Sequence, residues 1–114
     1  MTLLRRWRMW FGVVFVETPT FTKRVLELLD DEQYSALQMK LARHPDAGAL
    51  IPGSGGMRKI RWAACGRGKR GGVRLIYYWW VAQDRISLLF VYPKSEQDNL
   101  SADQVKLLRR ALEI

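Results

Sequence analysis

Apolar and polar residues recur along the chain with two different periods, and the change of period separates helical from strand-forming segments. Residues 11–17 form a short, apolar, β-branched run, which is typical of a buried strand. Thr18 and Pro19 follow it, and a capping hydroxyl before a proline predicts the start of a helix. Beyond a glycine-rich loop at residues 47–56, the period at which apolar residues recur falls from that of a helix, about 3.6 residues, to that of a strand, about two. The pattern therefore predicts a first strand followed by helices, and then a change to strands after residue 56.

Two amphipathic helices are expected between residues 18 and 45. The second begins at Asp30 or Asp31, either of which can cap it, and Pro45 ends it. The apolar faces of the two helices consist of Phe21, Val25, Leu28 and Leu29, and then of Tyr34, Leu37 and Leu41. Because the connection between the helices is short, we expect an antiparallel hairpin.

Three strands and a last helix are expected after residue 56. Residues 58–62 alternate in character, and residues 73–81 and 85–92 form two longer strands joined around Gln83-Asp84. Ser101 and Gln104 have the spacing of a capping box, which predicts the final helix. The expected order is β-α-α-β-β-β-α, an α+β fold with a small, twisted, mainly antiparallel sheet.

The positive charge of the chain is concentrated in one region. The net charge over 114 residues is +8, and residues 57–94 alone carry nine cations against a single acid, Asp84. The same region contains seven aromatic residues, so it predicts a rigid basic surface that meets a polyanion, most simply a nucleic acid.

Several other classes of protein are disfavoured. A single cysteine, Cys65, gives no disulfide framework, and with the single histidine, His44, it gives no zinc site. No apolar run approaches the ~20 residues of a membrane span. Glu17 stands where a signal peptide would need small residues. We therefore expect a cytoplasmic protein without cofactor or metal, with a basic arm at residues 1–10 and a single domain at residues 11–114.

The candidate chemistry lies on the strands. Lys59 and Arg61 are two residues apart, so their side chains should emerge on the same face, within about 7 Å of each other. Arg74 lies in an otherwise apolar strand that we expect to be central, and few acids near it in sequence could pair with it. This favours Arg74 as a phosphate ligand over a structural ion pair. Tyr92 and Lys94 flank the end of the last strand, at the mouth of the sheet.

Other cations are better suited to binding than to chemistry. Arg67, Lys69 and Arg70 lie in a glycine-rich loop that cannot hold a fixed geometry, so we expect them to bind RNA phosphates, together with Arg58. Of the aromatic run at residues 77–80, most side chains are expected in the core.

Three segments resemble the RelE/HigB toxins of bacterial toxin–antitoxin pairs, within the RelE/ParE superfamily. They are GGMRKIRW at residues 55–62, GRGKRGGVRLIYY at residues 66–78 and VYPKSE at residues 91–96. The resemblance extends from about residue 11 to the C-terminus, and the glycine-basic loop leading into the RLIYY strand is its most specific part.

The resemblance implies a RelE-like fold and an endoribonuclease that cuts mRNA in the ribosomal A site. It also implies a cognate, DNA-binding antitoxin that masks the toxin. Carried over to this chain, the catalytic residues are Lys59, Arg61, Arg74 and Lys94. Relatives of the RelE branch use a tyrosine in the C-terminal segment where this chain has Leu100, so either Tyr92 serves instead or the site uses cations alone.

Attack by the 2′-hydroxyl of the RNA needs neither a protein nucleophile nor a metal. We expect Arg61 and Arg74 to bind the phosphate, Lys59 to accept the 2′ proton and Lys94 to protonate the leaving oxygen. Two alternatives remain open: a ParE-like toxin that inhibits DNA gyrase without nuclease activity, and a nucleic-acid-binding module without catalysis.

Overall fold

The structure is a computed structural model of the chain, and it describes residues 7–63 and 71–112. Within these residues, six strands form one mixed sheet in the order β1-β2-β6-β5-β4-β3. The elements are β1 (Trp7–Trp10), β2 (Val13–Glu17), α1 (Pro19–Leu28), α2 (Asp31–Arg43), β3 (Ala49–Leu50), β4 (Arg58–Trp62), β5 (Val73–Trp80), β6 (Arg85–Pro93) and α3 (Ala102–Leu112). The β2–β6 pair is parallel and the other pairs are antiparallel. The expected α+β class is confirmed.

The helical hairpin begins and ends where its capping residues predict. The Thr18 hydroxyl accepts a hydrogen bond from the backbone N–H of Phe21, and proline occupies the first helical position of α1. Asp30 caps α2 in a capping box with Gln33. Ser101 and Gln104 form the expected capping box at the start of α3.

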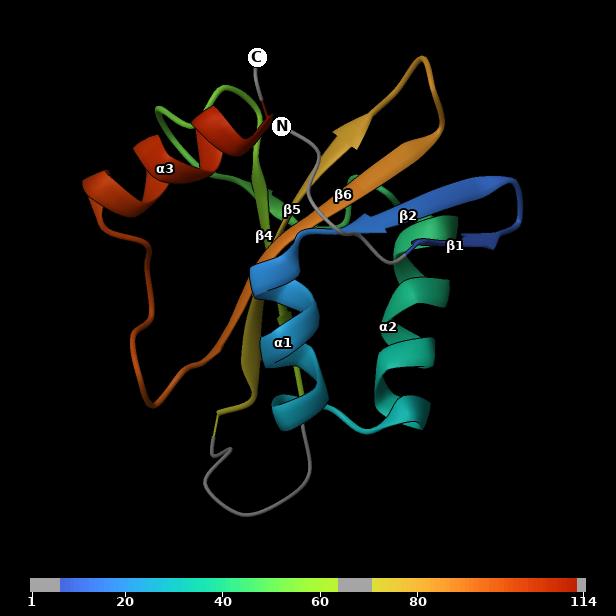
Figure 1. The fold of residues 1–114 in the computed structure, drawn as a ribbon, viewed down its shortest axis with the longest axis horizontal. Helices are drawn as coiled ribbons and strands as arrows, with labels where there is room; N and C mark the ends of the chain where they lie inside the picture. Colours follow the sequence, from blue (N-terminus) through green and yellow to red (C-terminus); the bar gives the residue numbers. More distant parts are fainter. Residues whose placement is uncertain (1–6, 64–70, 113–114) are drawn as a thin grey trace.

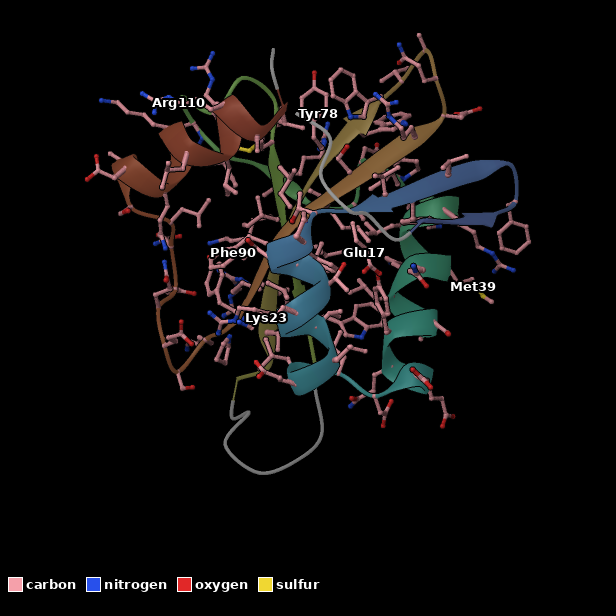
Figure 2. The ribbon with its side chains drawn as sticks, in the orientation of Figure 1. Glu17, Lys23, Met39, Tyr78, Phe90 and Arg110 are labelled. Atoms are coloured by element: carbon pink, nitrogen blue, oxygen red, sulfur yellow. The ribbon has the colours of Figure 1, made fainter. Side chains whose placement is uncertain are left out.

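The helices cover the two faces of the sheet, with α1 and α2 on one side and α3 on the other (Figure 1). Figure 2 shows Glu17 between α1 and α2, where it accepts hydrogen bonds from Thr22 of one helix and Tyr34 of the other. The cluster under the hairpin is built on Phe15, Phe21, Leu37, Leu75 and Leu88, and the smaller one under α3 on Met57, Ile76, Leu89, Tyr92 and Leu112. In the part of the chain that the structure describes, no helix is long and apolar enough to cross a bilayer.

Strand β5 is central, as expected, because it pairs with β4 on one side and β6 on the other. Its first five residues are buried. The turn into β5 depends on Gly72, which has φ of +74°, and a Cβ there would overlap the carbonyl oxygen of Trp62. Glycine at this position therefore lets the chain enter β5 directly against β4.

Two strands were not expected from the sequence. Residues 7–10, assigned to the basic arm, form β1 and pair with β2, while residues 1–6 lie outside the described part of the chain. The strand expected at residues 11–17 begins only at Val13, because Phe11 and Gly12 form the tight turn between β1 and β2 with φ of +51° and +79°. The two-residue β3 pairs with β4 at the edge of the sheet.

Candidate active site

The register of the three central strands brings most of the predicted cations to one face. Arg61 of β4 lies directly opposite Arg74 of β5, and Arg74 lies opposite Tyr92 of β6. Directly opposed residues in antiparallel strands project from the same side of a sheet, which here is the side covered by α3. Lys59 shares this face because it is two residues before Arg61. We call Lys59, Arg61 and Arg74 the cationic cluster.

Arg74 is the most constrained member of the cluster. It is 4% exposed, and its Nη1 donates to the carbonyl oxygens of Gly71 at 3.0 Å and Val73 at 3.4 Å. Its Nε donates to Oδ1 of Asp98 at 3.1 Å. The guanidinium is therefore held on one edge by the backbone at the start of β5 and meets a carboxylate on the other.

Arg74 does have an acidic partner, although few acids lie near it in the sequence. Asp98 follows it by 24 residues and belongs to the loop between β6 and α3. Figure 1 shows that this loop turns back after β6 before it reaches α3. The acid is distant along the chain and close in space, so a search for neighbouring acids in the sequence missed it.

The β6–α3 loop, residues 94–101, also contacts the other side chains of this face. Lys59 Nζ donates to Oδ1 of Asn99 at 2.6 Å and to the carbonyl oxygen of Asp98 at 3.2 Å. The hydroxyl of Tyr92 donates to the same carbonyl at 3.2 Å. Asp98 and Asn99 were not singled out from the sequence, where their one signal was a run of polar residues after the last strand.

Electrostatics around the cluster follow from these contacts. Desolvation opposes ionisation of Asp98, but the hydrogen bond from Arg74 and the charges of Arg74, Lys59 and Arg61 outweigh it, so its pKa lies below the usual value. Burial raises the pKa of Tyr92, with Asp98 adding to the effect and Arg74 opposing it. At neutral pH the site therefore holds an ionised carboxylate and a protonated phenol.

A hollow of about 480 Å³ opens beside the cluster, between the β3–β4 region and the start of α3. Lys59 and Arg61 line it on the sheet side, and Asn99 and Leu100 line it on the loop side. Leu100, which the resemblance to RelE toxins aligns with a tyrosine, thus lies at the hollow but brings no hydroxyl to it. The hollow is large enough to admit a nucleotide-sized group.

Lys94, the fourth predicted catalytic cation, lies at the same end of the sheet. Its backbone N–H donates to the carbonyl oxygen of Gly72 at 3.1 Å. Its side chain runs along Gly71, where an added Cβ would come within 2.8 Å of the Lys94 Cδ. Because Gly71 also supplies a carbonyl to Arg74, Lys94 adjoins the cationic cluster from the exposed side.

The predicted RNA-binding residues are not all near this face. Arg58 points to the opposite side of the sheet, where its Nη1 donates to the carbonyl oxygens of Asp46 and Gly48. Arg67, Lys69 and Arg70 lie outside the described residues. Tyr92 is completely buried, and its hydroxyl is directed at the β6–α3 loop. The position of Tyr92 favours a role in holding the loop over a role at the reacting atoms.

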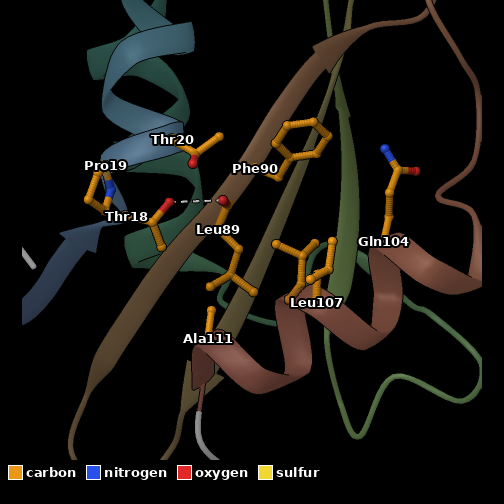
Figure 3. Close-up of a pocket in the computed structure, with 9 residues that line it drawn as sticks. Thr18, Pro19, Thr20, Leu89, Phe90, Gln104, Leu107 and Ala111 are labelled. Atoms are coloured by element: carbon orange, nitrogen blue, oxygen red, sulfur yellow. Dashed lines mark hydrogen bonds between the residues drawn. The ribbon is translucent and has the colours of Figure 1, made fainter. Parts of the chain in front are cut away.

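A second, larger hollow of about 590 Å³ lies between the start of α1, strand β6 and α3 (Figure 3). At its edge the Thr18 hydroxyl donates to the carbonyl oxygen of Leu89 at 3.0 Å. The side chains that line it are mainly apolar, and no charged residue is among those the structure describes there. A polyanion therefore fits the first hollow and not this one.

Comparison with known families adds one finding. A family model described as the RelE toxin of the RelE/RelB toxin–antitoxin system matches residues 21–113. The matched range covers most of the chain and includes the cationic cluster, Lys94 and the whole β6–α3 loop.

Proposed function

Because the chain belongs to the RelE toxin family, the toxins of toxin–antitoxin pairs, we propose that it is an mRNA endoribonuclease that acts on the ribosome. The observation that carries this proposal is the placement of Lys59, Arg61 and Arg74 on one face of the sheet beside an open hollow. Three cations at this spacing match the charge that a phosphodiester develops when it is cleaved.

The reaction begins when the 2′-oxygen of the RNA attacks the adjacent phosphorus. A bond forms between them, the bond to the 5′-oxygen breaks, and the products are a 2′,3′-cyclic phosphate and a 5′-hydroxyl. Arg61 and Arg74 stabilise the negative charge on the phosphorane oxygens. The hydrogen bonds from Arg74 to the backbone support this role, since a guanidinium that is already oriented needs little reorganisation during the reaction.

The two lysines of the site suit different roles in the reaction. Lys94 is exposed next to the cluster, and it suits the donation of a proton to the leaving 5′-oxygen. Lys59 already donates hydrogen bonds to two oxygens of the loop. To accept the 2′ proton, Lys59 would have to lose both hydrogen bonds and one of its own protons. Binding the phosphate as a cation requires no change in the charge of Lys59. We therefore propose Lys59 as a phosphate-binding residue; the 2′ proton passes to solvent water, and Lys94 supplies the proton that the leaving 5′-oxygen takes up.

The ribosome supplies what the chain does not. In-line attack requires the 2′-oxygen, phosphorus and 5′-oxygen to be aligned, and mRNA fixed in the A site presents them in a defined geometry. The natural partners in this proposal are the ribosome with its mRNA in the cytoplasm, and a cognate, DNA-binding antitoxin. A net charge of +8 favours an acidic segment of that antitoxin as the inhibitor.

The test compares two arginine variants in a reconstituted translation reaction. Arg61→Ala removes an exposed cation of the cluster and should slow mRNA cleavage by ~10². Arg110→Ala removes an equal charge from the last turn of α3, where the side chain points away from the sheet (Figure 2), and should change the rate less than about twofold. Equal rates for Arg61→Ala and the wild type would contradict the proposal. Loss of DNA supercoiling activity of gyrase with no cleavage would identify the ParE-like alternative instead.

A further inference from the structure

The carboxylate of Asp98 occupies the position on Arg74 that a substrate phosphate would use. The Nη1 edge of the guanidinium is engaged by backbone carbonyls, and Asp98 sits on its Nε. The arginine side chain is 5% exposed, whereas the Asp98 side chain is 48% exposed. The cation is therefore fixed in the sheet, whereas the anion that pairs with it belongs to the exposed β6–α3 loop.

The loop that carries Asp98 is held in part by Lys59, which the proposed function assigns to RNA. Lys59 donates hydrogen bonds to the Asp98 carbonyl and the Asn99 side chain, and the Tyr92 hydroxyl donates to the same carbonyl. The hydrogen bonds from Lys59 and Arg74 run from cations to loop oxygens, and phosphate oxygens can replace these acceptors in kind. Loop and substrate thus compete for one set of donors.

We propose that Asp98 is an internal substitute for the RNA phosphate, which holds the cationic cluster in the free protein and is displaced when substrate binds. This inference rests on the proposed function, because it concerns the same cations. A buried guanidinium without a counter-anion would be costly, and Asp98 removes that cost until phosphate arrives. Because Asp98 is half-exposed, it can move into water without a buried carboxylate being left behind.

The exchange has a consequence for selectivity. Each phosphodiester that binds at Arg74 must break one charge-assisted hydrogen bond in order to form its own, so free RNA gains little net affinity. RNA that another body holds in place loses less entropy on binding and can still complete the exchange. Displacing Asp98 costs the same free energy in both cases, but the smaller entropy cost lets RNA presented by the ribosome still bind where loose RNA does not.

The experiment measures binding separately from cleavage. The probe is a short, fluorescently labelled RNA in which every 2′-hydroxyl is methylated, so that attack on phosphorus is impossible. Asp98→Asn keeps an oxygen that can accept from Arg74 Nε but removes the charge, and it should bind the probe about tenfold more tightly than the wild type.

The matched control is Glu96→Gln, which removes the same charge from the same loop. Glu96 is 47% exposed and pairs with Arg24 at 2.8 Å, outside the cationic cluster. A general change in net charge should therefore tighten binding less than about twofold in this variant. If Asp98→Asn binds the probe no more tightly than Glu96→Gln, or more weakly than the wild type, the inference is overturned.

A second measurement uses the unmodified protein and does not depend on the stability of any variant. Titration with inorganic phosphate, followed by amide resonances, should shift Asp98 and Asn99 as the loop leaves the cluster, while Glu96 moves less. Asp98 and Asn99 resonances that stay unchanged while phosphate binds would overturn the inference. Tighter probe binding without any mRNA cleavage in translation would leave the inference standing and refute the nuclease. Cleavage without tighter binding would do the reverse.

Discussion

Arg74 is the residue whose replacement should separate chemistry from stability most clearly. Arg74→Lys keeps the positive charge but replaces a planar group that binds Gly71 and Asp98 on different edges. A single ammonium at the end of a flexible chain cannot satisfy both acceptors from the buried position of Arg74. Arg74→Ala removes the charge as well and leaves both acceptors without this donor.

The expected magnitudes follow from these contacts. A hydrogen bond to a charged group contributes about 1.5–3 kcal/mol, and the contribution is smaller where the partner is half-exposed, as Asp98 is. With the volume left in the core, Arg74→Ala should lower the free energy of unfolding by roughly 2–4 kcal/mol, and Arg74→Lys by about 1–2 kcal/mol. Both variants should lose a similar factor in cleavage rate, about 10²–10³, because neither offers an oriented guanidinium to the phosphorane.

Urea unfolding gives the stability of each variant, and the cleavage rate is then measured in reconstituted translation at a temperature where both variants are folded. The diagnostic result is a folded Arg74→Lys protein with a rate close to that of Arg74→Ala. If Arg74→Lys is folded and cleaves mRNA at the wild-type rate, charge alone suffices and the role of the oriented guanidinium is refuted.

Three further predictions concern capping, backbone geometry and pH. Thr18→Ala should lower the free energy of unfolding by about 1–2 kcal/mol, because the hydroxyl both caps α1 and donates to a carbonyl of β6. The control Thr20→Ala, in the same turn, should change the free energy of unfolding by less than about 0.5 kcal/mol. Gly72→Ala should lower the free energy of unfolding, measured by thermal unfolding, by roughly 2–4 kcal/mol, because a positive φ is combined with overlap of the added Cβ with the last carbonyl of β4. Gly12 also has a positive φ but open space around it, so Gly12→Ala should lower the free energy of unfolding by about 1–2 kcal/mol. The pKa of Asp98 is lowered from 3.8, so its ion pair stabilises the fold fully above that pH and the contribution is lost as pH falls through the folded-state value. The stability difference between wild type and Asp98→Asn, measured by urea unfolding, should therefore be larger at pH 6 than at pH 3, and a difference that grows on acidification would contradict the assignment.

The helices and central strands were predictable because each carries local signals. Thr18 with Pro19, and Ser101 with Gln104, mark helix starts by chemistry that acts within one turn. The apolar run of β5 predicts a central strand, since only a strand covered on both faces tolerates so few polar residues. These features depend on neighbours in the sequence, and the structure confirms them.

The candidate site was predictable only in part. Lys59 and Arg61 follow from the alternation of a strand, and Arg74 follows from its place in an otherwise apolar strand, but strand register places Arg61 opposite Arg74. The partner of Arg74 depends on how a loop folds back over the sheet, and no period or motif encodes that path. For the same reason, no local pattern indicated that Arg58 faces the opposite side of the sheet.

The most direct test of the account maps the 5′ ends of an mRNA in a purified system, with and without ribosomes, after addition of the wild-type protein. The account predicts new 5′-hydroxyl ends within translated codons when ribosomes are present, few on the same RNA alone, and their loss in Arg61→Ala but not in Arg110→Ala. Equal cleavage of naked and translated RNA, or no cleavage in either, would contradict it.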